Sequence, residues 1–101
     1  MSGTPTIGRI VHYRLSEQDA ERIYELRTAA RMHQSPGFNA AYGGDVYPAI
    51  VVRTFDDILN VNLQVFLDGP DTLWVTSRGY SVETEGCWFW PPRIDTTREG
   101  R

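Results

Sequence analysis

Residues 46–77 constrain the fold of this 101-residue chain more than any other stretch. Apolar residues alternate there with polar or small ones, and β-branched and aromatic types are frequent, as in strands that bury one face. The pattern predicts a three-stranded antiparallel meander with strands at 46–55, 61–67 and 72–77. The Asp-Gly-Pro-Asp segment at 68–71 predicts the second turn, because Gly adopts a positive φ and Pro cannot continue a ladder. In the middle strand, one face is formed by Val61, Leu63, Val65 and Leu67.

The remaining elements flank this meander. Residues 8–14 predict a first strand, and the apolar cluster at 87–90, which ends at two prolines, predicts a last short one. Between the first strand and the meander, Ser16 followed by Asp19 forms a weak capping box, so we expect a helix over about 17–33. The expected fold is mainly β with one helix inserted after the first strand: a small antiparallel SH3-like barrel or a strongly bent sheet.

Length and composition indicate one domain, over residues 8–94, between a flexible leader at 1–7 and a flexible tail at 95–101. The net charge of −3 argues against general nucleic-acid binding, because neutralising phosphates requires an excess of cations. All ten cationic residues are arginine, which suits bidentate contacts to carboxylate or phosphate but also fits a simple compositional bias. The single cysteine, Cys87, excludes an internal disulfide. With no signal peptide and no apolar run of spanning length, a soluble cytoplasmic protein is expected.

Self-association is expected from the helix and the sheet edges. The apolar stripe of the helix is narrow, which predicts that the helix lies on the barrel surface or packs against another copy. A chain this short also leaves strand edges open. Pro48, which has no amide donor, predicts that its strand begins at a sheet edge or a bulge.

Catalytic patterns are nearly absent from the sequence. There is no nucleophile–base motif, metal-ligand spacing or phosphate-binding glycine loop, so neither an enzyme nor a cofactor is expected. His12 is interpreted as a packed residue rather than a base or ligand. Asp56 and Asp57 fit a turn better than an acid–base pair.

The candidate binding residues are aromatic side chains close in sequence to arginines. By strand alternation Trp88 and Trp90 share a face, which leaves Phe89 on the other. Flat rings beside arginine can stack on a base and bind phosphate, although the same tryptophans could instead close the ends of a small barrel. The predicted ligand- or partner-binding set is Trp74, Trp88, Trp90, Arg53, Arg78 and Tyr80.

Five segments of the chain resemble a set of small uncharacterised bacteriophage and prophage proteins. The segments are GRIVHYRL at 8–15, GDVYPAIVVRTF at 44–55, VNLQVFLDG at 61–69, LWVTS at 73–77 and CWFWPPR at 87–93. The resemblance implies a phage origin. It implies no activity and no site residues.

Two functions are therefore kept open. The first is a phage-encoded, non-enzymatic binding protein of the host cytoplasm that counters host defence by sequestering a nucleotide signal or blocking a host protein. The alternative is a virion structural protein, either a capsid decoration or a tail-associated component, with phage structural proteins as partners. No membrane is involved in either hypothesis, and a homo-oligomer is expected in both.

Overall fold

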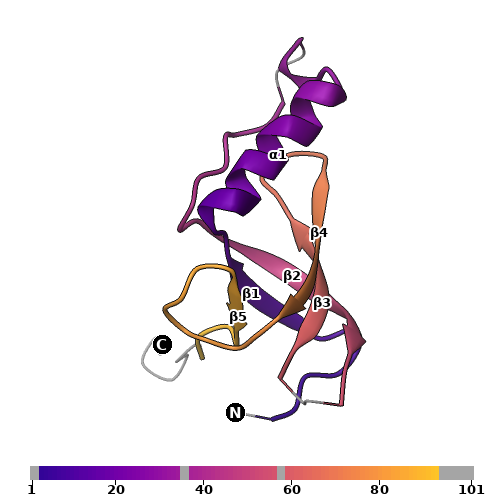
Figure 1. The fold of residues 1–101 in the computed structure, drawn as a ribbon, viewed down its shortest axis with the longest axis vertical. Helices are drawn as coiled ribbons and strands as arrows, with labels where there is room; N and C mark the ends of the chain where they lie inside the picture. The colour runs from indigo at the N-terminus through magenta and orange to yellow at the C-terminus, as the bar shows by residue number, and fades with distance from the viewer. Residues whose placement is uncertain (1–2, 35–36, 57–58, 94–101) are drawn as a thin grey trace, which may run out of the picture.

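The computed structural model describes residues 3–34, 37–56 and 59–93, so Asp57 and the predicted tail lie outside the described part. These described residues form five strands and one α-helix, in the order predicted from the sequence (Figure 1). Their bounds are β1 Ile10–Arg14, α1 Glu17–Ala29, η1 Met32–Gln34, β2 Val46–Thr54, β3 Val61–Phe66, β4 Thr72–Arg78 and β5 Cys87–Phe89. The η1 element is a short 3-10 helix that directly follows α1.

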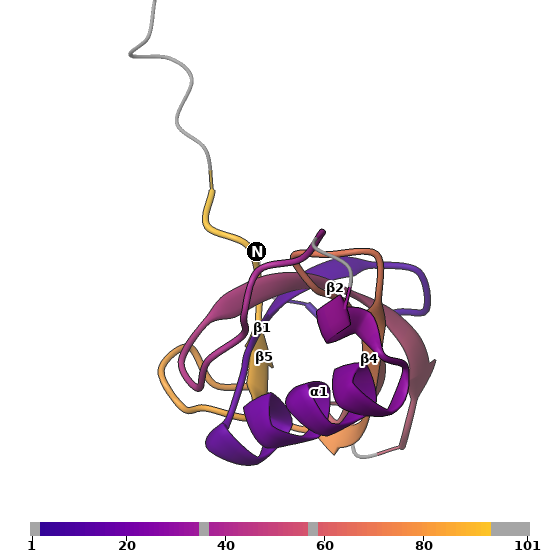
Figure 2. The ribbon, with the colours of Figure 1, turned by 90° about the horizontal axis from the view of Figure 1, so that it is seen from above.

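The strands form one antiparallel sheet in the order β4-β3-β2-β1-β5. The sheet curls into a half-barrel, and α1 crosses one end of it (Figure 2). Beyond β4 the chain reaches the far edge of the sheet, where Tyr80 forms an isolated bridge with Trp88 of β5. The predicted mainly β fold with a helix after the first strand is confirmed.

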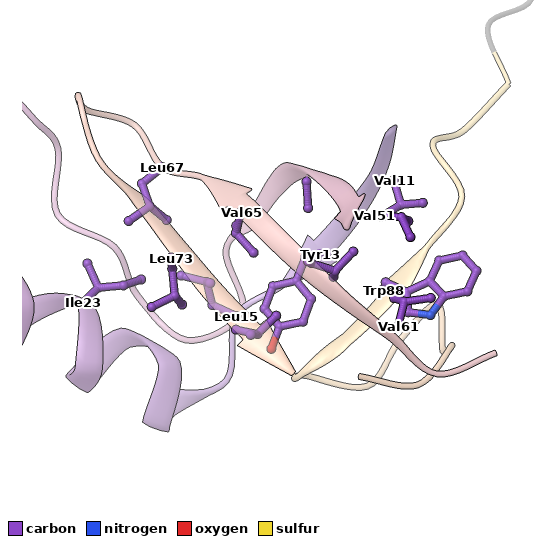
Figure 3. Packing of buried hydrophobic residues seen from close by; sticks show 13 residues of the cluster. Val11, Tyr13, Leu15, Ile23, Val51, Val61, Val65, Leu67, Leu73 and Trp88 are labelled. Carbon is purple, nitrogen blue, oxygen red and sulfur yellow. The ribbon is translucent and has the colours of Figure 1, made fainter. Parts of the chain in front are cut away.

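The meander predicted from period-two alternation is present as β2, β3 and β4. Leu63 and Val65 of β3 are fully buried, and β3 lies between two neighbouring strands. Figure 3 shows the core extending from Ile23, Leu67 and Leu73 beside the helix to Val11, Val51, Val61 and Trp88 at the other end. Inward residues of every strand therefore share a single core, which is what one amphipathic sheet of this length can bury.

The helix begins where the capping pattern predicts and ends earlier than expected. Ser16 Oγ accepts the Asp19 N–H at 3.0 Å, and Asp19 Oδ2 accepts the Ser16 N–H at 3.0 Å, which completes the capping box. The helix stops at Ala29 because Arg31 has a φ of 60°, a left-handed conformation that an α-helix cannot continue through. The predicted extension to residue 33 is thus replaced by the separate turn η1.

The helix is anchored to the sheet by more than its narrow apolar stripe. Ile23 belongs to the core, and Arg27, only 2% exposed, forms an ion pair with Asp71 in the β3–β4 turn. The expectation that α1 lies on the barrel surface or against another copy is therefore incomplete. It was based on apolar residues alone, and the buried Arg27 also joins α1 to the β3–β4 hairpin.

The position of Pro48 corrects the expectation of an edge strand. Its strand, β2, is the middle strand of the sheet, and Pro48 pairs with His12 of β1. The ladder with β3 starts only at Ala49, and the β2 irregularity lies at Val51–Arg53. The Val51 N–H donates to the Arg9 carbonyl, so the backbone groups of residue 51 face β1. Alternation then directs the Pro48 nitrogen toward β3, one residue before Ala49, where pairing with β3 begins. A missing donor is tolerated there because the ladder has no acceptor opposite it.

The predicted leader is also in part packed, because Pro5 is fully buried. Two hydrogen bonds hold the chain just after it: the Gly8 N–H donates to the Val51 carbonyl and the Arg9 N–H to the Thr6 carbonyl. Arg9 thereby has a fixed backbone although it precedes β1.

Candidate functional site

The structure brings together three of the six predicted site residues around Trp88. Its ring meets those of Tyr80 and Trp90 edge to face, with centroids 5.0 Å and 5.2 Å away. Trp88 itself is fully buried, and its Nε1 donates to the Leu59 carbonyl at 2.8 Å. Trp88 is therefore a core residue that supports its two neighbours, and no ligand can reach its ring.

The other three predicted residues lie elsewhere. Trp74 is 53% exposed on the outer face of β4, the opposite face of the sheet from Trp88. The Arg53 guanidinium lies 5.4 Å from the centroid of the Phe55 ring at the end of β2. The expected single rim that joins Trp74 to the terminal tryptophans is therefore not formed, because the alternation along β4 and β5 directs these rings to opposite faces.

Arg78 points into a buried polar cluster beneath the start of α1. Its Nη2 donates to Asp19 Oδ1 at 3.3 Å, and the Tyr13 hydroxyl donates to Asp19 Oδ2 at 2.6 Å. Burial and the adjacent Asp19 carboxylate raise the pKa of the Tyr13 phenol. Since Asp19 also caps α1, this cluster joins the helix start to β1 and the end of β4. It gives the Arg78 guanidinium an ion-pair partner within the fold, while the buried Arg78 Nε has no hydrogen-bond partner among the described residues.

A groove at the end of β1 and β5 carries the features expected of a binding site. It has a volume of about 500 Å³ and is lined by Arg9, Ile10, Trp90, Pro91 and Arg93; we call it the Trp90 groove. The Arg9 guanidinium lies 4.8 Å from the centroid of the Trp90 ring, within the range of a cation–π contact. Trp90 is held from behind by Trp88, so the ring is supported by the core.

The charge of the Trp90 groove is not compensated by the described part of the chain. Both ion pairs among the described residues use other arginines, Arg27 and Arg78, and neither the Arg9 nor the Arg93 side chain forms a hydrogen bond with a described residue. None of the described residues that line the groove has an acidic side chain. These two guanidinium groups have no ion-pair partner among the described residues, and beside an aromatic ring, an isoleucine and a proline they can bind an anion that carries a flat apolar part.

A second hollow, of about 290 Å³, lies between α1 and the segment that precedes β2. Its lining is mostly apolar and includes Ile23, Tyr24, Phe38 and Tyr42. Its one charged group, Arg27, is neutralised by Asp71 and stacks 4.2 Å from the Phe38 ring centroid. The polar groups left to orient a ligand there are the His33 ring and the hydroxyls of Tyr24 and Tyr42. The hollow therefore offers an anion no unpaired guanidinium among the described residues, and it is the weaker candidate.

The remaining residues weighed from the sequence occupy separate places. His12 packs edge to face against Phe89 at 5.6 Å on the outer face, and Cys87 is a partly buried free thiol. Within residues 3–34, 37–56 and 59–93, no group of three or more His, Cys, Asp or Glu side chains is placed to hold a metal ion. No helix among these residues is long and apolar enough to cross a membrane.

Comparison with protein-family models, curated proteins and solved structures gives no match, so the site is interpreted from its own geometry. The predicted binding set contains Trp90 but not Arg9, Ile10 or Arg93, although Arg93 is among the arginines close in sequence to the aromatic cluster. The sequence did contain a signal for Arg9. Arg9 lies two and four residues before the inward-facing Val11 and Tyr13, so alternation places it on the same face. Which strand lies beside β1, and hence which aromatic ring Arg9 meets, required the pairing of β1 with β5.

Proposed function

We propose that the chain is a phage-encoded, non-enzymatic binding protein that sequesters a nucleotide signal in the Trp90 groove, as a counter-defence factor in the host cytoplasm. The observation that carries this proposal is that Arg9 and Arg93, which form no ion pair with a described residue, line the same groove as a core-supported Trp90. The phage origin rests on the resemblance of the sequence segments, and the ligand class rests on the chemistry of the groove.

The groove suits a nucleotide because it offers separate places for a phosphate and a base. Guanidinium groups bind phosphate through paired, charge-assisted hydrogen bonds. A base can stack on the Arg9 guanidinium plane, which already lies over Trp90, or on the ring itself if Arg9 turns toward the phosphate. Ile10 and Pro91 supply the apolar wall that flat ligands require. The net charge of −3 is no obstacle, since the attraction needed is local to the groove.

The test is a calorimetric titration of cyclic and linear nucleotides into the purified protein, with tryptophan fluorescence as a second readout. We expect binding in which Arg9→Ala and Arg93→Ala each weaken affinity by about tenfold or more, because a hydrogen bond to a charged group contributes about 1.5–3 kcal/mol. The loss should be smaller in high salt, where the charged contact is already screened.

The matched control is Arg22→Ala, which removes the same charge from the exposed surface of α1. Far-UV circular dichroism should show that all three variants keep the fold. If no nucleotide binds at millimolar concentration, or if Arg22→Ala weakens binding as much as Arg9→Ala, the nucleotide proposal is wrong.

A second candidate function, contact with a protein, is favoured by the outer face of the sheet. Large apolar side chains are exposed there on four strands: Ile10, Val52, Phe66 and Trp74. An exposed apolar area of this kind is typical of protein interaction sites. A host protein or a neighbouring virion protein would fit it. Mass spectrometry of purified phage particles separates the two, because a capsid or tail component is abundant in the particle and a counter-defence factor is not.

A further inference from the structure

The two edges of the sheet differ in how well they are protected. At β5, which has only three residues, the Trp88 N–H donates to the Gly79 carbonyl and the Trp88 carbonyl accepts the Ser81 N–H, so the segment after β4 occupies this edge. Pro91 and Pro92 then end the strand. The β5 edge is thus short and already satisfied, as in proteins that avoid edge-to-edge association.

The β4 edge lacks these devices as far as Thr76, where its register with β3 shifts. The strand has seven residues, TLWVTSR, with no proline, no lysine and no charge before Arg78 at its end. Apart from its ladder with β3, β4 makes no backbone hydrogen bond to any residue that the structure describes. A long, uncharged edge strand rich in β-branched and aromatic residues is a template for pairing with another strand.

The register identifies which backbone groups are free. The Asp71 carbonyl accepts the Leu67 N–H, so residue 71 faces the β3 side, and alternation places Leu73 and Val75 on that side as well. The N–H and C=O groups of Thr72 and Trp74 and the N–H of Thr76 therefore point to the open edge; after Thr76 a bulge, with Ser77 at a φ of 57°, ends the regular alternation. The side chains of the same three residues are exposed on the outer face.

We infer that a second copy of this chain pairs with this edge, β4 against β4, antiparallel about a twofold axis beside Trp74. Pairing Trp74 with its own copy sets Thr72 opposite Thr76, so the two Trp74 residues exchange both backbone bonds and each Thr76 N–H meets a Thr72 carbonyl. The two Arg78 residues then lie at opposite ends of the pair, so no like charges face each other. The two Trp74 rings become neighbours on the outer face, a favourable cross-strand contact.

The occupied β5 edge supports a second β4 as the partner. A β4–β5 contact would be head to tail and would generate open chains, whereas β4–β4 pairing is isologous and closes at two copies. The paired strands would join two five-stranded sheets into one continuous sheet. Because the contact is built on a single strand, the dimer should be of modest affinity and should form at micromolar concentrations.

Sedimentation velocity across a range of protein concentrations tests the inference. The wild-type protein should change from an 11.5 kDa species to one of twice that mass as concentration rises to high micromolar. Trp74→Lys places a charge at the twofold axis, and Thr72→Pro removes a free edge donor without removing a bond to β3. Each should weaken the dimer at least about tenfold.

The matched control is Gln64→Lys, which adds the same charge on the outer face of β3, directly opposite Trp74 but away from the edge. This variant should still dimerise. A wild-type protein that stays monomeric at high micromolar concentration overturns the inference, as does a dimer that is unaffected by Trp74→Lys. Equal dissociation of the Gln64→Lys protein would show that the outer face, and not the edge, is the contact.

Discussion

The ion pair between Arg27 and Asp71 should be the strongest single polar contribution to the stability of this fold. Arg27 Nε donates to Asp71 Oδ2 at 2.8 Å, its Nη2 donates to Oδ1 at 3.1 Å, and its Nη1 donates to the Asn39 carbonyl at 2.9 Å. One side chain thereby joins α1, the β3–β4 turn and the segment before β2. The Arg27 side chain is 2% exposed and that of Asp71 is 22% exposed, so the two partners differ in their access to water.

This difference predicts an asymmetric response to mutation. Asp71→Ala leaves a buried guanidinium with only a carbonyl and the Phe38 ring, and breaking a buried pair in this way costs about 3–5 kcal/mol. Arg27→Met keeps most of the stem and leaves a carboxylate that water can partly reach, so we expect a smaller cost of about 1–3 kcal/mol. The double variant should cost less than the sum of the two by about 1–3 kcal/mol, because the residues interact directly.

Urea denaturation of the four proteins, followed by tryptophan fluorescence and far-UV circular dichroism, measures these free energies of unfolding. Equal slopes with denaturant would validate the comparison. The reasoning is refuted if Arg27→Met costs more than Asp71→Ala, or if the two single costs add in the double variant to within about 0.5 kcal/mol.

Three further predictions concern stability. Leu63→Ala should cost about 2–4 kcal/mol through lost burial and a cavity in the core, whereas Phe66→Ala on the outer face of the same strand should cost less than about 1 kcal/mol in the same denaturation assay. The hydrogen bonds from Arg27 lower the pKa of Asp71. The contribution of the Asp71 carboxylate to stability is therefore complete above the unfolded-state pKa of about 3.9 and is lost as pH falls through the lower folded-state value. The free energy of unfolding, measured from pH 7 to 2, should fall less steeply in Asp71→Asn than in the wild type. Ser16→Ala removes the N-cap of α1 and should lower the unfolding free energy by about 1 kcal/mol, with Ser16→Asp restoring most of it.

The sequence predicts the strands well because each inward residue contributes to one core. Val61, Leu63 and Val65 alternate along β3, and together with Leu67 just after the strand they all belong to the core. The end of α1 and the place of Pro48 were less predictable. The first depends on a left-handed Arg31, and the second on the residue at which one ladder stops while the other continues. Neither the end of the helix nor the position of Pro48 follows from residue type alone, so propensities cannot predict them.

The candidate site was harder to predict than the fold because it depends on which strands become neighbours. Trp88 and Trp90 share a face as predicted, but burial separates their roles: one is a fully covered core residue and the other lines a groove. Proximity in sequence suggested Arg78 as the cationic partner, and Asp19 holds it instead. Arg9 is about eighty residues away from Trp90 and reaches it only because β1 and β5 are adjacent.

The two proposed binding surfaces use different strands, and this separation makes them independently testable. The Trp90 groove is built on the start of β1 and the residues after β5, whereas the proposed dimer contact is built on β4, at the opposite end of the strand order. A dimer paired through β4 should therefore keep two open grooves and bind one nucleotide per chain. It follows that Trp74→Lys should dissociate the dimer with nucleotide affinity unchanged, and that Arg9→Ala should weaken nucleotide binding with the sedimenting mass unchanged. If either variant altered both readouts by more than about threefold, the groove and the β4 edge would be coupled, and the separation argued from the sheet order would be wrong.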